Sequence, residues 1–363
     1  MKSAAQSPTP EDRPVRVVVL YGGQSAEHEV SRVTAAHVLA AIDRSRYTVE
    51  AIGIDRDGQW RLFEPPADVE SLPALPVAGT IVSPPEVFAD SNADQLTVVL
   101  PLLHGPMGED GTVQGLLELA NVPYVGAGVL GSALAMDKAA AKATLSAAGV
   151  PQARWRAIHE PAWSGDEDAI TGILHDLGET VFVKPANMGS SVGVSKATGS
   201  ADVRVALKEA FRYDEWAVVE ETIVGRELEL AVLGNVELEF SVPGEIVPGA
   251  EFYDYDDKYV DGAAKLIIPA ELSRSEVAEM ERLAAQAYRA LRVEGMGRVD
   301  FLYEPNGRGF LLNEINTIPG FTPISMYPKM WEATGLSYPR LIDTLIELAL
   351  DRHHRRSAKR QLD

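Results

Sequence analysis

The stretch VFVKPANMGSSVGVS, residues 181–195, joins an apolar strand to a loop rich in glycine and serine. The strand ends in Lys184 and Pro185, and the loop that follows contains Gly189 and Gly193. Glycine lets the backbone adopt positive φ and approach a ligand closely, so several N–H groups can converge on one anion. The stretch taken alone predicts either an anion cradle or an ordinary hairpin loop, and the rest of the chain must decide between them.

Length and composition narrow the class of protein. The 363 residues exceed one typical core, so we expect two or three domains. The absence of cysteine excludes disulfides, thiolate zinc sites and a cysteine nucleophile. A net charge of −20 argues against a nucleic-acid surface. Because the polar N-terminus is not a secretory signal and no apolar run reaches the length of a membrane span, we expect a cytoplasmic protein with no nucleic acid and no membrane as a partner.

The first third of the chain has the pattern of a parallel α/β domain. VRVVVLYGG and TVEAIGID read as strands, and a helical pattern over residues 31–42 lies between them. LTVVLPLLHG repeats the strand pattern and ends near His104. The proline-rich segment between Pro65 and Pro85 is expected to be irregular.

The later parts mix helices with strands that are joined through turns. The alanine-rich stretch over residues 132–149 predicts one strong helix. GRVDFLYEPNGRGFLLNEIN, residues 297–316, predicts two strands around an Asn-Gly turn. The basic stretch DRHHRRSAKR, residues 351–360, follows the last helical pattern and is expected to be a solvated tail.

GAGVLG, residues 126–131, matches the dinucleotide-binding fingerprint and raises the alternative of a dehydrogenase. That fingerprint needs an acidic residue about twenty positions later to bind the ribose, and residues 146–155 contain none. We therefore favour a tight connection between a strand and a helix. A Walker A triplet is also missing from the sequence, so any nucleotide requires another architecture.

Asp300, Glu314 and Asn316 carry the oxygen atoms that Mg²⁺ prefers. Glu314 and Asn316 are two residues apart, so they share one face of a strand. A three-residue loop centred on Gly307 would place Asp300 opposite Glu314. A two-residue turn would shift that register by one, so a metal site requires the longer loop. The alternative is three polar residues on a solvated face.

Lys138 and Lys184 lie on different elements, and each could meet a phosphate with a single positive charge. An isolated lysine is more often a surface residue. Together with the glycine-serine loop and the carboxylates, the two lysines describe a site that holds a triphosphate and stabilises phosphoryl transfer by charge and position.

A set of motifs resembles the D-alanine–D-alanine ligases of the ATP-grasp superfamily, from about Val15 to about Leu350. In chain order the motifs are YGGQSAEHEVS, LHGPMGEDGTVQG, ALAMDK, VKPANMGSSVGVS, EFYDYDDKY, GRVDF and NEINTIPGFTPISMYP. The resemblance implies an ATP-grasp fold, in which an N-terminal parallel-sheet α/β domain precedes two α+β domains that hold ATP between them. The glycine-serine loop would be the lid over the triphosphate. The domains implied are 15–126, 127–219 and 220–355, with disordered tails at 1–14 and 356–363.

In this family, ATP phosphorylates the carboxylate of one D-alanine, and the amine of a second D-alanine attacks the acyl phosphate. The products are D-alanyl-D-alanine for peptidoglycan precursors, ADP and phosphate. The resemblance therefore implies ATP as co-substrate and two Mg²⁺ or Mn²⁺ ions as cofactors. We expect a homodimer whose partners are its small-molecule substrates, D-alanine and ATP.

The resemblance also assigns roles to individual residues. The implied metal ligands are Asp300, Glu314 and Asn316. The implied ATP-binding residues are Lys138, Lys184, Ser191, Glu220 and Glu227. The implied catalytic residues are Glu27, Ser190, Tyr259, Arg298 and Gly320. The implied substrate-binding residues are His104, Lys258, Ser325 and Met326.

Within the catalytic set, Arg298 and the amide of Gly320 would stabilise the acyl phosphate and the tetrahedral oxyanion. Glu27 would receive the ammonium of the first D-alanine. Ser190 would orient that substrate together with Tyr259 and Glu27. Without the resemblance, Glu27 would be interpreted as a residue at the N-terminus of a helix, and Ser190 as an ordinary turn residue.

In the substrate-binding set, His104 would lie near the first D-alanine, and Ser325 would bind the carboxylate of the second. Without the resemblance, Ser325 would be interpreted as a helix N-cap. Met326 occupies a position that varies within the family.

Two rivals to this reading are separated by specific residues. Family members that make D-alanyl-D-lactate lack the tyrosine found here at Tyr259 beside Lys258, so this pair favours an amine as second substrate. A regulatory protein that binds a nucleotide without turnover would not need Glu27, Ser190 and Arg298 together with all three metal ligands.

Overall fold

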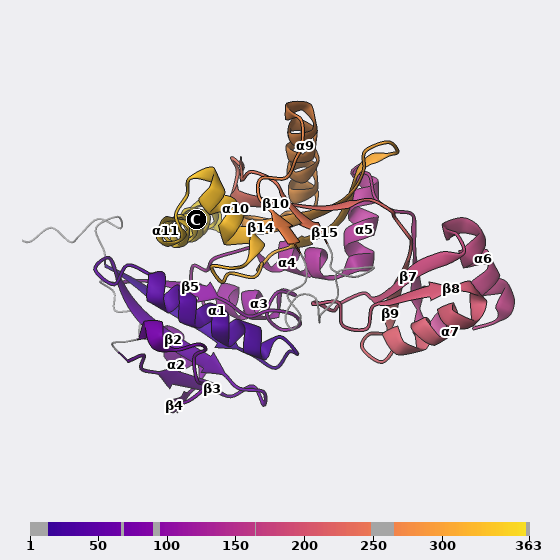
Figure 1. Cartoon of the computed structure of the whole chain (residues 1–363). Helices are drawn as coiled ribbons and strands as arrows, with labels where there is room; N and C mark the ends of the chain where they lie inside the picture. Colours follow the sequence, from indigo (N-terminus) through magenta and orange to yellow (C-terminus); the bar gives the residue numbers. More distant parts are fainter. Residues whose placement is uncertain (1–13, 67–68, 90–94, 164, 248–264, 361–363) are drawn as a thin grey trace, which may run out of the picture.

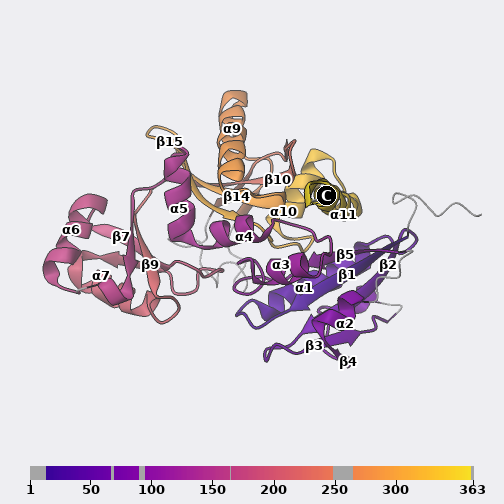
Figure 2. The ribbon, with the colours of Figure 1, turned by 180° about the vertical axis from the view of Figure 1, so that it is seen from behind.

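The computed structural model describes residues 14–66, 69–89, 95–163, 165–247 and 265–360, which are built around three sheets. Figures 1 and 2 show the first sheet at one end of the molecule and the sheet flanked by α6 and α7 at the other, with the third sheet between and above them. None of the helices within the described ranges has the length and apolar character needed to cross a bilayer.

The first sheet has the strand order β4-β3-β2-β1-β5. Strand β1 pairs in parallel with β2 and with β5, so the predicted parallel βαβ unit is confirmed. The elements are β1 (Val15–Gly22), α1 (His28–Ala41), β2 (Tyr47–Ile54), β3 (Trp60–Phe63), η2 (Val69–Ser71), β4 (Thr80–Val82), α2 (Pro84–Ala89), β5 (Leu96–Pro101) and α3 (Thr112–Leu119). The prediction of an irregular segment between Pro65 and Pro85 is wrong for β4, because antiparallel pairing with β3 supplies order that local proline content does not reveal.

The second sheet is antiparallel throughout, in the order β6-β9-β7-β8, and has its own apolar core with α6 and α7. Helices α4 (Val129–Met136) and α5 (Lys138–Ala147) lead into this sheet. The remaining elements are β6 (Trp155–His159), η3 (Glu160–Ala162), α6 (Glu167–Leu177), β7 (Thr180–Pro185), β8 (Ser195–Thr198), α7 (Gly199–Ala210) and β9 (Trp216–Glu221).

The single helix predicted over residues 132–149 is wrong, because the chain breaks at Asp137. Asp137 has extended backbone angles, and its side chain accepts a hydrogen bond of 2.8 Å from the backbone N–H of Ala140. An N-cap of this kind starts a new helix despite the high helix propensity of the alanines around it. The break places Lys138 in the first turn of α5.

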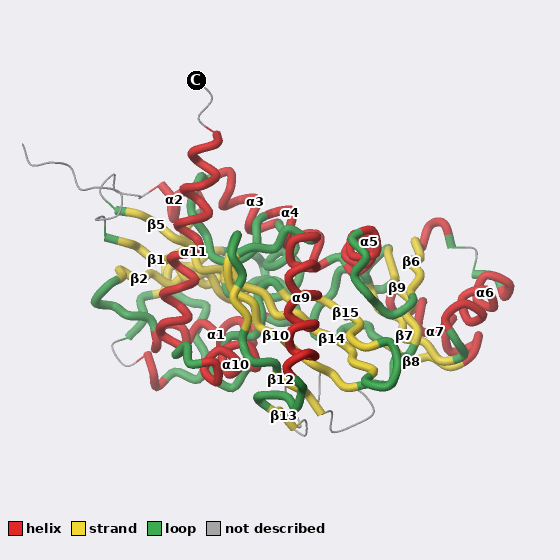
Figure 3. Tube along the Cα trace, turned by 90° about the horizontal axis from the view of Figure 1, so that it is seen from above, coloured by secondary structure: helices red, strands yellow, loops and turns green. Residues whose placement is uncertain are grey.

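The third sheet runs β13-β12-β10-β14-β15, and β11 pairs with β10. Its elements are β10 (Arg226–Gly234), β11 (Glu239–Phe240), β12 (Gly244–Val247), β13 (Lys265–Ile267), α9 (Arg274–Ala290), β14 (Gly295–Glu304), β15 (Gly309–Asn316), α10 (Met326–Thr334) and α11 (Tyr338–Arg360). Figure 3, seen from above, shows α9 lying across these strands, whereas α11 lies to one side of them, near β1 and β5.

The β14–β15 hairpin sets the register of the predicted metal ligands. Asp300 pairs with Glu314, as predicted, but the three-residue loop is wrong. Glu304 pairs with Gly309 across four loop residues, and a β-bulge between the pairs Asp300–Glu314 and Phe301–Leu312 shifts the register. The bulge therefore restores the alignment that the loop alone would miss.

Helix α11 joins the first sheet to the third. Its apolar residues belong to the same core as residues of β1, α1 and β14, and the helix contacts β5, α1 and β14. The two sheets thus share a core, whereas the second sheet has a separate one.

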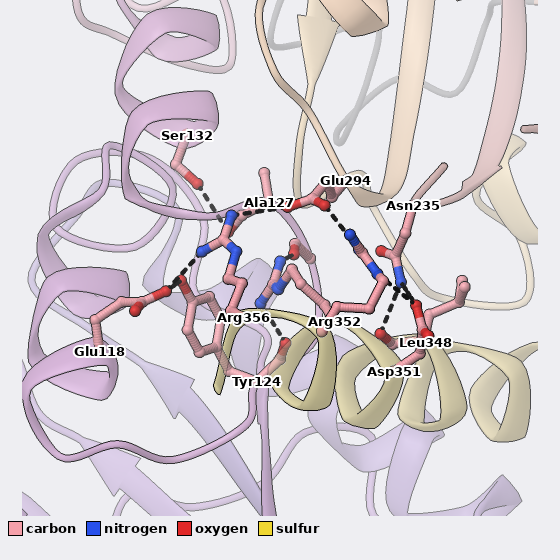
Figure 4. A network of polar contacts seen from close by, with 12 residues as sticks. Glu118, Tyr124, Ala127, Ser132, Asn235, Glu294, Leu348, Asp351, Arg352 and Arg356 are labelled. Carbon is pink, nitrogen blue, oxygen red and sulfur yellow. Dashed lines mark hydrogen bonds and ion pairs between the residues drawn. The ribbon is translucent and has the colours of Figure 1, made fainter. Parts of the chain in front are cut away.

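The end of α11 contradicts the predicted solvated and disordered tail. Residues 356–360 are helical, and basic side chains of this stretch contact other parts of the chain. Arg352 is only 3% exposed and donates to the carbonyls of Gly126 and Tyr124. Arg356 makes ion pairs of 2.8 Å with Glu118 and Glu294 (Figure 4). The GAGVLG turn is therefore tied to the last helix.

Candidate functional site

A cleft of about 1150 Å³ runs between elements of all three sheets, which is large enough for a nucleotide together with smaller substrates. Every predicted site residue that the structure describes lines it: Glu27, His104, Lys138, Lys184, Ser190, Ser191, Glu220, Glu227, Arg298, Asp300, Glu314, Asn316, Gly320, Ser325 and Met326. Lys258 and Tyr259 lie outside the described residues.

The glycine-serine loop reaches across the cleft to the start of α1. Ser190 and Ser191 both have positive φ, 48° and 59°, which is uncommon for serine. The Ser190 hydroxyl donates to Oε1 of Glu27, which occupies the N-cap position of α1. A Cβ at Gly189 would lie 2.7 Å from Oε2 of Glu27, so a larger residue here would displace the Glu27 carboxyl group.

A buried carboxylate between two lysines marks the end of the cleft near β7 and β9. Glu220 is 4% exposed, with Nζ of Lys184 at 2.8 Å from Oε2 and Nζ of Lys142 at 3.0 Å from Oε1. Burial alone would raise the pKa of Glu220, but Lys142 and Lys184 outweigh it and lower the pKa to about 2. Burial likewise opposes the charge of Lys184, yet Glu220 raises its pKa. Both charges of the Glu220–Lys184 pair are therefore retained at neutral pH.

Lys138 lies beside this group and is oriented toward the loop. Its Nζ donates to the carbonyl of Met188 at 2.6 Å, and its backbone N–H donates to the carbonyl of Ala186 at 2.9 Å. Burial lowers the pKa of Lys138. The first turn of α5 thus fixes an ammonium group where the loop begins.

Arg298 and Asp300 form a second charged group on β14. Nε and Nη2 of Arg298 donate to the two oxygens of Asp300 at 2.8 and 2.7 Å, and Nε lies 3.2 Å from Oε1 of Glu229. Asn316 donates to Asp300 at 2.9 Å. Burial opposes the charge of Arg298, but Asp300 and Glu229 raise its pKa well above the usual value. The arginine is therefore always charged and is held by two carboxylates.

His104 and Glu109 face the cleft from the turn that follows β5. The ring Nδ1–H of His104 donates to the carbonyl of Ile318 at 3.0 Å, because a carbonyl can only accept. Burial lowers the pKa of His104, which keeps the ring neutral. Oε1 of Glu109 accepts from the backbone N–H of Gly105 at 3.1 Å. Burial, and then Glu27, raise the pKa of Glu109 to about 8.

Gly320 and Ser325 lie together at the start of α10. A Cβ at Gly320 would lie 3.1 Å from the Ser325 hydroxyl oxygen. Ser325 occupies the N-cap position of α10, while its hydroxyl oxygen accepts from the backbone N–H of Thr322 at 3.2 Å and lies 2.8 Å from the Thr322 hydroxyl. Met326 is buried behind them.

Three polar residues of this region were missed in the sequence. Lys142 is four positions after Lys138 on one helix, a spacing that places both on one face. Glu229 follows Glu227 at the two-residue spacing of one strand face. Glu109 lies within the motif LHGPMGEDG, but nothing in the local pattern separates it from Asp110 beside it.

Models of one protein family match most of the chain. The model described as D-ala D-ala ligase N-terminus matches residues 16–127, and the model described as D-ala D-ala ligase C-terminus matches residues 144–347.

Relatives and solved structures cover nearly the whole chain. A protein of Bacillus cytotoxicus named D-alanine–D-alanine ligase is 45% identical over 93% of this chain and 96% of its own length. The D-alanine–D-alanine ligase structure from Coxiella burnetii has a TM-score of 0.78 at 37% identity, covering 95% of this chain and 97% of that one. The VanG D-Ala:D-Ser ligase of Enterococcus faecalis has a TM-score of 0.80 at 34% identity, covering 93% and 100%. The ATP-grasp fold that the sequence predicts is confirmed by these structures.

Proposed function

Since this chain belongs to the D-alanine–D-alanine ligase family, we propose that it joins two D-alanine molecules to D-alanyl-D-alanine with ATP, releasing ADP and phosphate, as a step in making peptidoglycan precursors. The observation that carries the proposal is a single cleft containing two lysines, a glycine-serine loop and opposed carboxylates. These are the groups that activation of a carboxylate by ATP requires.

At the nucleotide end, Lys138, Lys184 and the loop at Ser191 hold the phosphates. The ammonium of Lys138 and the positive φ angles of the loop support this role, because loop N–H groups in this conformation can converge on an anion. Glu220 and Glu227 contact the adenosine. The lysine pairing of Glu220 keeps this carboxylate ionised for an acceptor role.

Two Mg²⁺ or Mn²⁺ ions are held by Asp300, Glu314 and Asn316. The donor set fits hard cations, since Asp300 and Glu314 are directly opposed and Asn316 contacts Asp300. Mg²⁺ is usually bound through one or two carboxylates together with substrate phosphates and water, so the phosphates of ATP would complete the coordination. When bound, the ions neutralise charge on the transferring phosphoryl group.

The chain's own residues prepare the two D-alanines. Glu27 binds the ammonium of the first D-alanine and is fixed by the hydroxyl of Ser190. The amide of Gly320 and the guanidinium of Arg298 stabilise the acyl phosphate and the oxyanion that forms when the second amine attacks. Tyr259 acts with Ser190 in orienting the substrate. His104 lies beside the first D-alanine.

Specificity for the second substrate is assigned to Ser325, Met326 and the Lys258–Tyr259 pair. The hydroxyl of Ser325 binds the incoming carboxylate, and the tyrosine favours an amine over D-lactate. A related protein is named as a D-Ala:D-Ser ligase, so D-serine is the competitor to test first.

A homodimer, a cytoplasmic location and the domain limits 15–126, 127–219 and 220–355 are further proposals. The first and third sheets share one apolar core, whereas the second sheet has its own. This supports a central domain that packs more independently than the other two.

The test measures phosphate release from ATP and Mg²⁺ with D-alanine, L-alanine, D-alanine plus D-serine, and D-alanine plus D-lactate, with products identified by mass. We expect D-alanyl-D-alanine as the main product and no reaction with L-alanine. Binding of ATP without turnover on any of these substrates would overturn the proposal and indicate a regulatory protein. Binding of NAD in place of ATP would instead indicate a dehydrogenase.

A further inference from the structure

We propose that Glu109 is an additional substrate-binding residue, whose Oε2 accepts one N–H of the first D-alanine's ammonium group beside Glu27 and His104. The inference rests on the proposed function, because it names a contact within the same site. The substrate-binding residues that the family resemblance implies do not include Glu109.

The first step is that Glu109 presents an oxygen to the cleft. The residue is 8% exposed and lines the cleft. Oε1 is occupied by the backbone N–H of Gly105, whereas Oε2 makes no hydrogen bond to any part of the chain that the structure describes. Burial and Glu27 raise the pKa of Glu109, and the backbone N–H groups of Gly105 and Ile318 oppose this rise only in part. A buried polar atom without a partner is costly, and in a binding site it indicates an atom that the ligand will satisfy.

The second step is that Glu109 and Glu27 converge on one place. Gly105 separates them, because its N–H bonds to Glu109 and a Cβ on it would lie 2.8 Å from Oε2 of Glu27. Glu27 is also close enough to Glu109 to raise its pKa, after the larger effect of burial. One of two acids held this close keeps a proton until a cation lies beside them, and a bound ammonium group would favour the ionised, accepting form of Glu109.

The third step adds His104, the residue before Gly105. Its Nδ1–H is committed to Ile318, so Nε2 carries a lone pair, and over the described residues this atom has no hydrogen-bond partner either. A neutral ring with a free lone pair is an acceptor. Glu27, His104 and Glu109 therefore offer three acceptors close to Gly105.

Three acceptors match the three N–H donors of a primary ammonium group. A hydroxy acid has a single donor in that position, and an N-methylated amino acid has one donor fewer. The arrangement therefore predicts that the first subsite selects a primary amine by satisfying each of its N–H bonds, in addition to the charge of Glu27.

The test compares the wild-type enzyme with Glu109→Gln, in which an N–H₂ donor can replace the accepting Oε2 while the other position keeps the bond to Gly105. D-alanine and N-methyl-D-alanine are titrated at equilibrium, and KM values for the first D-alanine, the second D-alanine and ATP are determined. We expect D-alanine affinity at the first subsite to fall by about 10- to 100-fold, the range for a hydrogen bond to a charged group. The KM for ATP and for the second D-alanine should change less than about threefold, and the preference for D-alanine over N-methyl-D-alanine should shrink.

The matched control is Asp110→Asn in the same turn. Asp110 accepts from the backbone N–H groups of Met107 and Thr112, so this variant perturbs the turn without touching the ammonium subsite. First-subsite affinity within twofold of wild type in Glu109→Gln would overturn the inference, as would an equal loss in Asp110→Asn or an unchanged preference between the two amino acids. Failure of the proposed function is distinguishable, because a wild-type protein that binds D-alanine without ligating it still gives the binding result for Glu109.

Discussion

The two ends of the cleft treat a buried glutamate in opposite ways. At the nucleotide end, Glu220 is neutralised by two lysines of the chain, and its pKa is lowered to about 2. At the first-substrate end, Glu109 is also buried, but burial and a neighbouring acid raise its pKa to about 8. Both glutamates are buried, and the difference lies in where the compensating charge comes from.

Some polar groups of the cleft find their partners when the protein folds, whereas others find them only when a ligand binds. A carboxylate paired within the chain is fixed when the protein folds and can serve as a rigid support for other groups. A carboxyl group left with an unsatisfied atom destabilises the folded state until a ligand arrives, which is a common cost of a binding site. We therefore expect substitutions at the nucleotide end to affect stability most, and those at the substrate end to affect affinity most.

The largest expected effect lies between the two ends, at Asp300. It is paired with Arg298 like the carboxylate of the nucleotide end, yet we have proposed it as a metal ligand. Asp300→Asn should lower kcat by about a thousandfold, the scale on which a lost electrostatic contact acts in a transition state. Because Glu229 remains beside Arg298, the free energy of unfolding should fall by no more than about 3 kcal/mol, the lower end for a buried ion pair that loses one charge. Steady-state rates over a Mg²⁺ titration and a denaturant titration check both; a stability loss with normal kcat would assign Asp300 to scaffolding.

The second prediction concerns loss of one of the two lysines that pair with Glu220 at the nucleotide end of the cleft. Lys142 is 2% exposed, so Lys142→Met leaves Glu220 with Lys184 alone. We expect the free energy of unfolding to fall by about 3 kcal/mol, as for other buried ion pairs that lose one partner. Urea denaturation measures this, with Lys208→Met on the exposed surface of α7 as a control that should be near neutral. A loss no larger than the control's would mean that the pairing contributes little to folding.

The third prediction uses pH to separate the two glutamates. The pKa of Glu220 is below the ordinary glutamate value of 4.5, so its contribution to stability is present above pH 4.5 and is lost as pH falls toward 2. The pKa of Glu109 is above 4.5, so its contribution is present below pH 4.5 and is lost as pH rises toward 8. The free energy of unfolding of wild type relative to Glu109→Gln should therefore decline between pH 4.5 and 8. Relative to Glu220→Gln, it should decline between pH 4.5 and 2. If the stability difference from wild type changed with pH in the same way for both variants, the proposed contrast between Glu109 and Glu220 would be wrong.

The smallest effect concerns the cap that positions Lys138. Asp137→Ala removes the hydrogen bond to Ala140 and should lower the free energy of unfolding by about 1 kcal/mol. Because the start of α5 then becomes less well defined, the KM for ATP should rise modestly while first-substrate affinity stays constant. Asp137→Asn keeps the cap and serves as the control. If both variants raise the KM for ATP equally, the charge of Asp137 and not the cap is responsible.

The sequence was sufficient to predict a structural feature where the pattern is local, and to predict the fold where family motifs occur in order along the chain. The β-branched run of β1 and the pattern of α1 predict the parallel first sheet, and the ordered motifs predict the ATP-grasp fold. All the predicted site residues within the described ranges line one cleft, while their chemical roles stay predictions.

Other features depend on partners that are distant in sequence. The alanines around Asp137 favour a continuous helix, and only the capping hydrogen bond to Ala140 interrupts it. The Asp300–Glu314 register was predicted through the wrong loop, because a bulge is not visible in an alternating pattern. Arg352 was assigned to a solvated tail because the carbonyls that it binds lie more than two hundred residues earlier. Glu109 could not be separated from its acidic neighbour without knowing which one is buried.

The position of α11 has a consequence for how the protein is made. Its apolar residues, Leu341, Ile342, Leu345, Ile346 and Ala349, complete a core that also contains Val17 and Val19 of the first strand. During translation the first strand leaves the ribosome long before the last helix, so part of the N-terminal apolar surface waits for the final segment of the chain. A nascent chain that stops before Tyr338 would carry that surface uncovered and would be a target for chaperones and proteases. Synthesis as far as α11 is thereby a condition for covering this apolar surface of the first sheet.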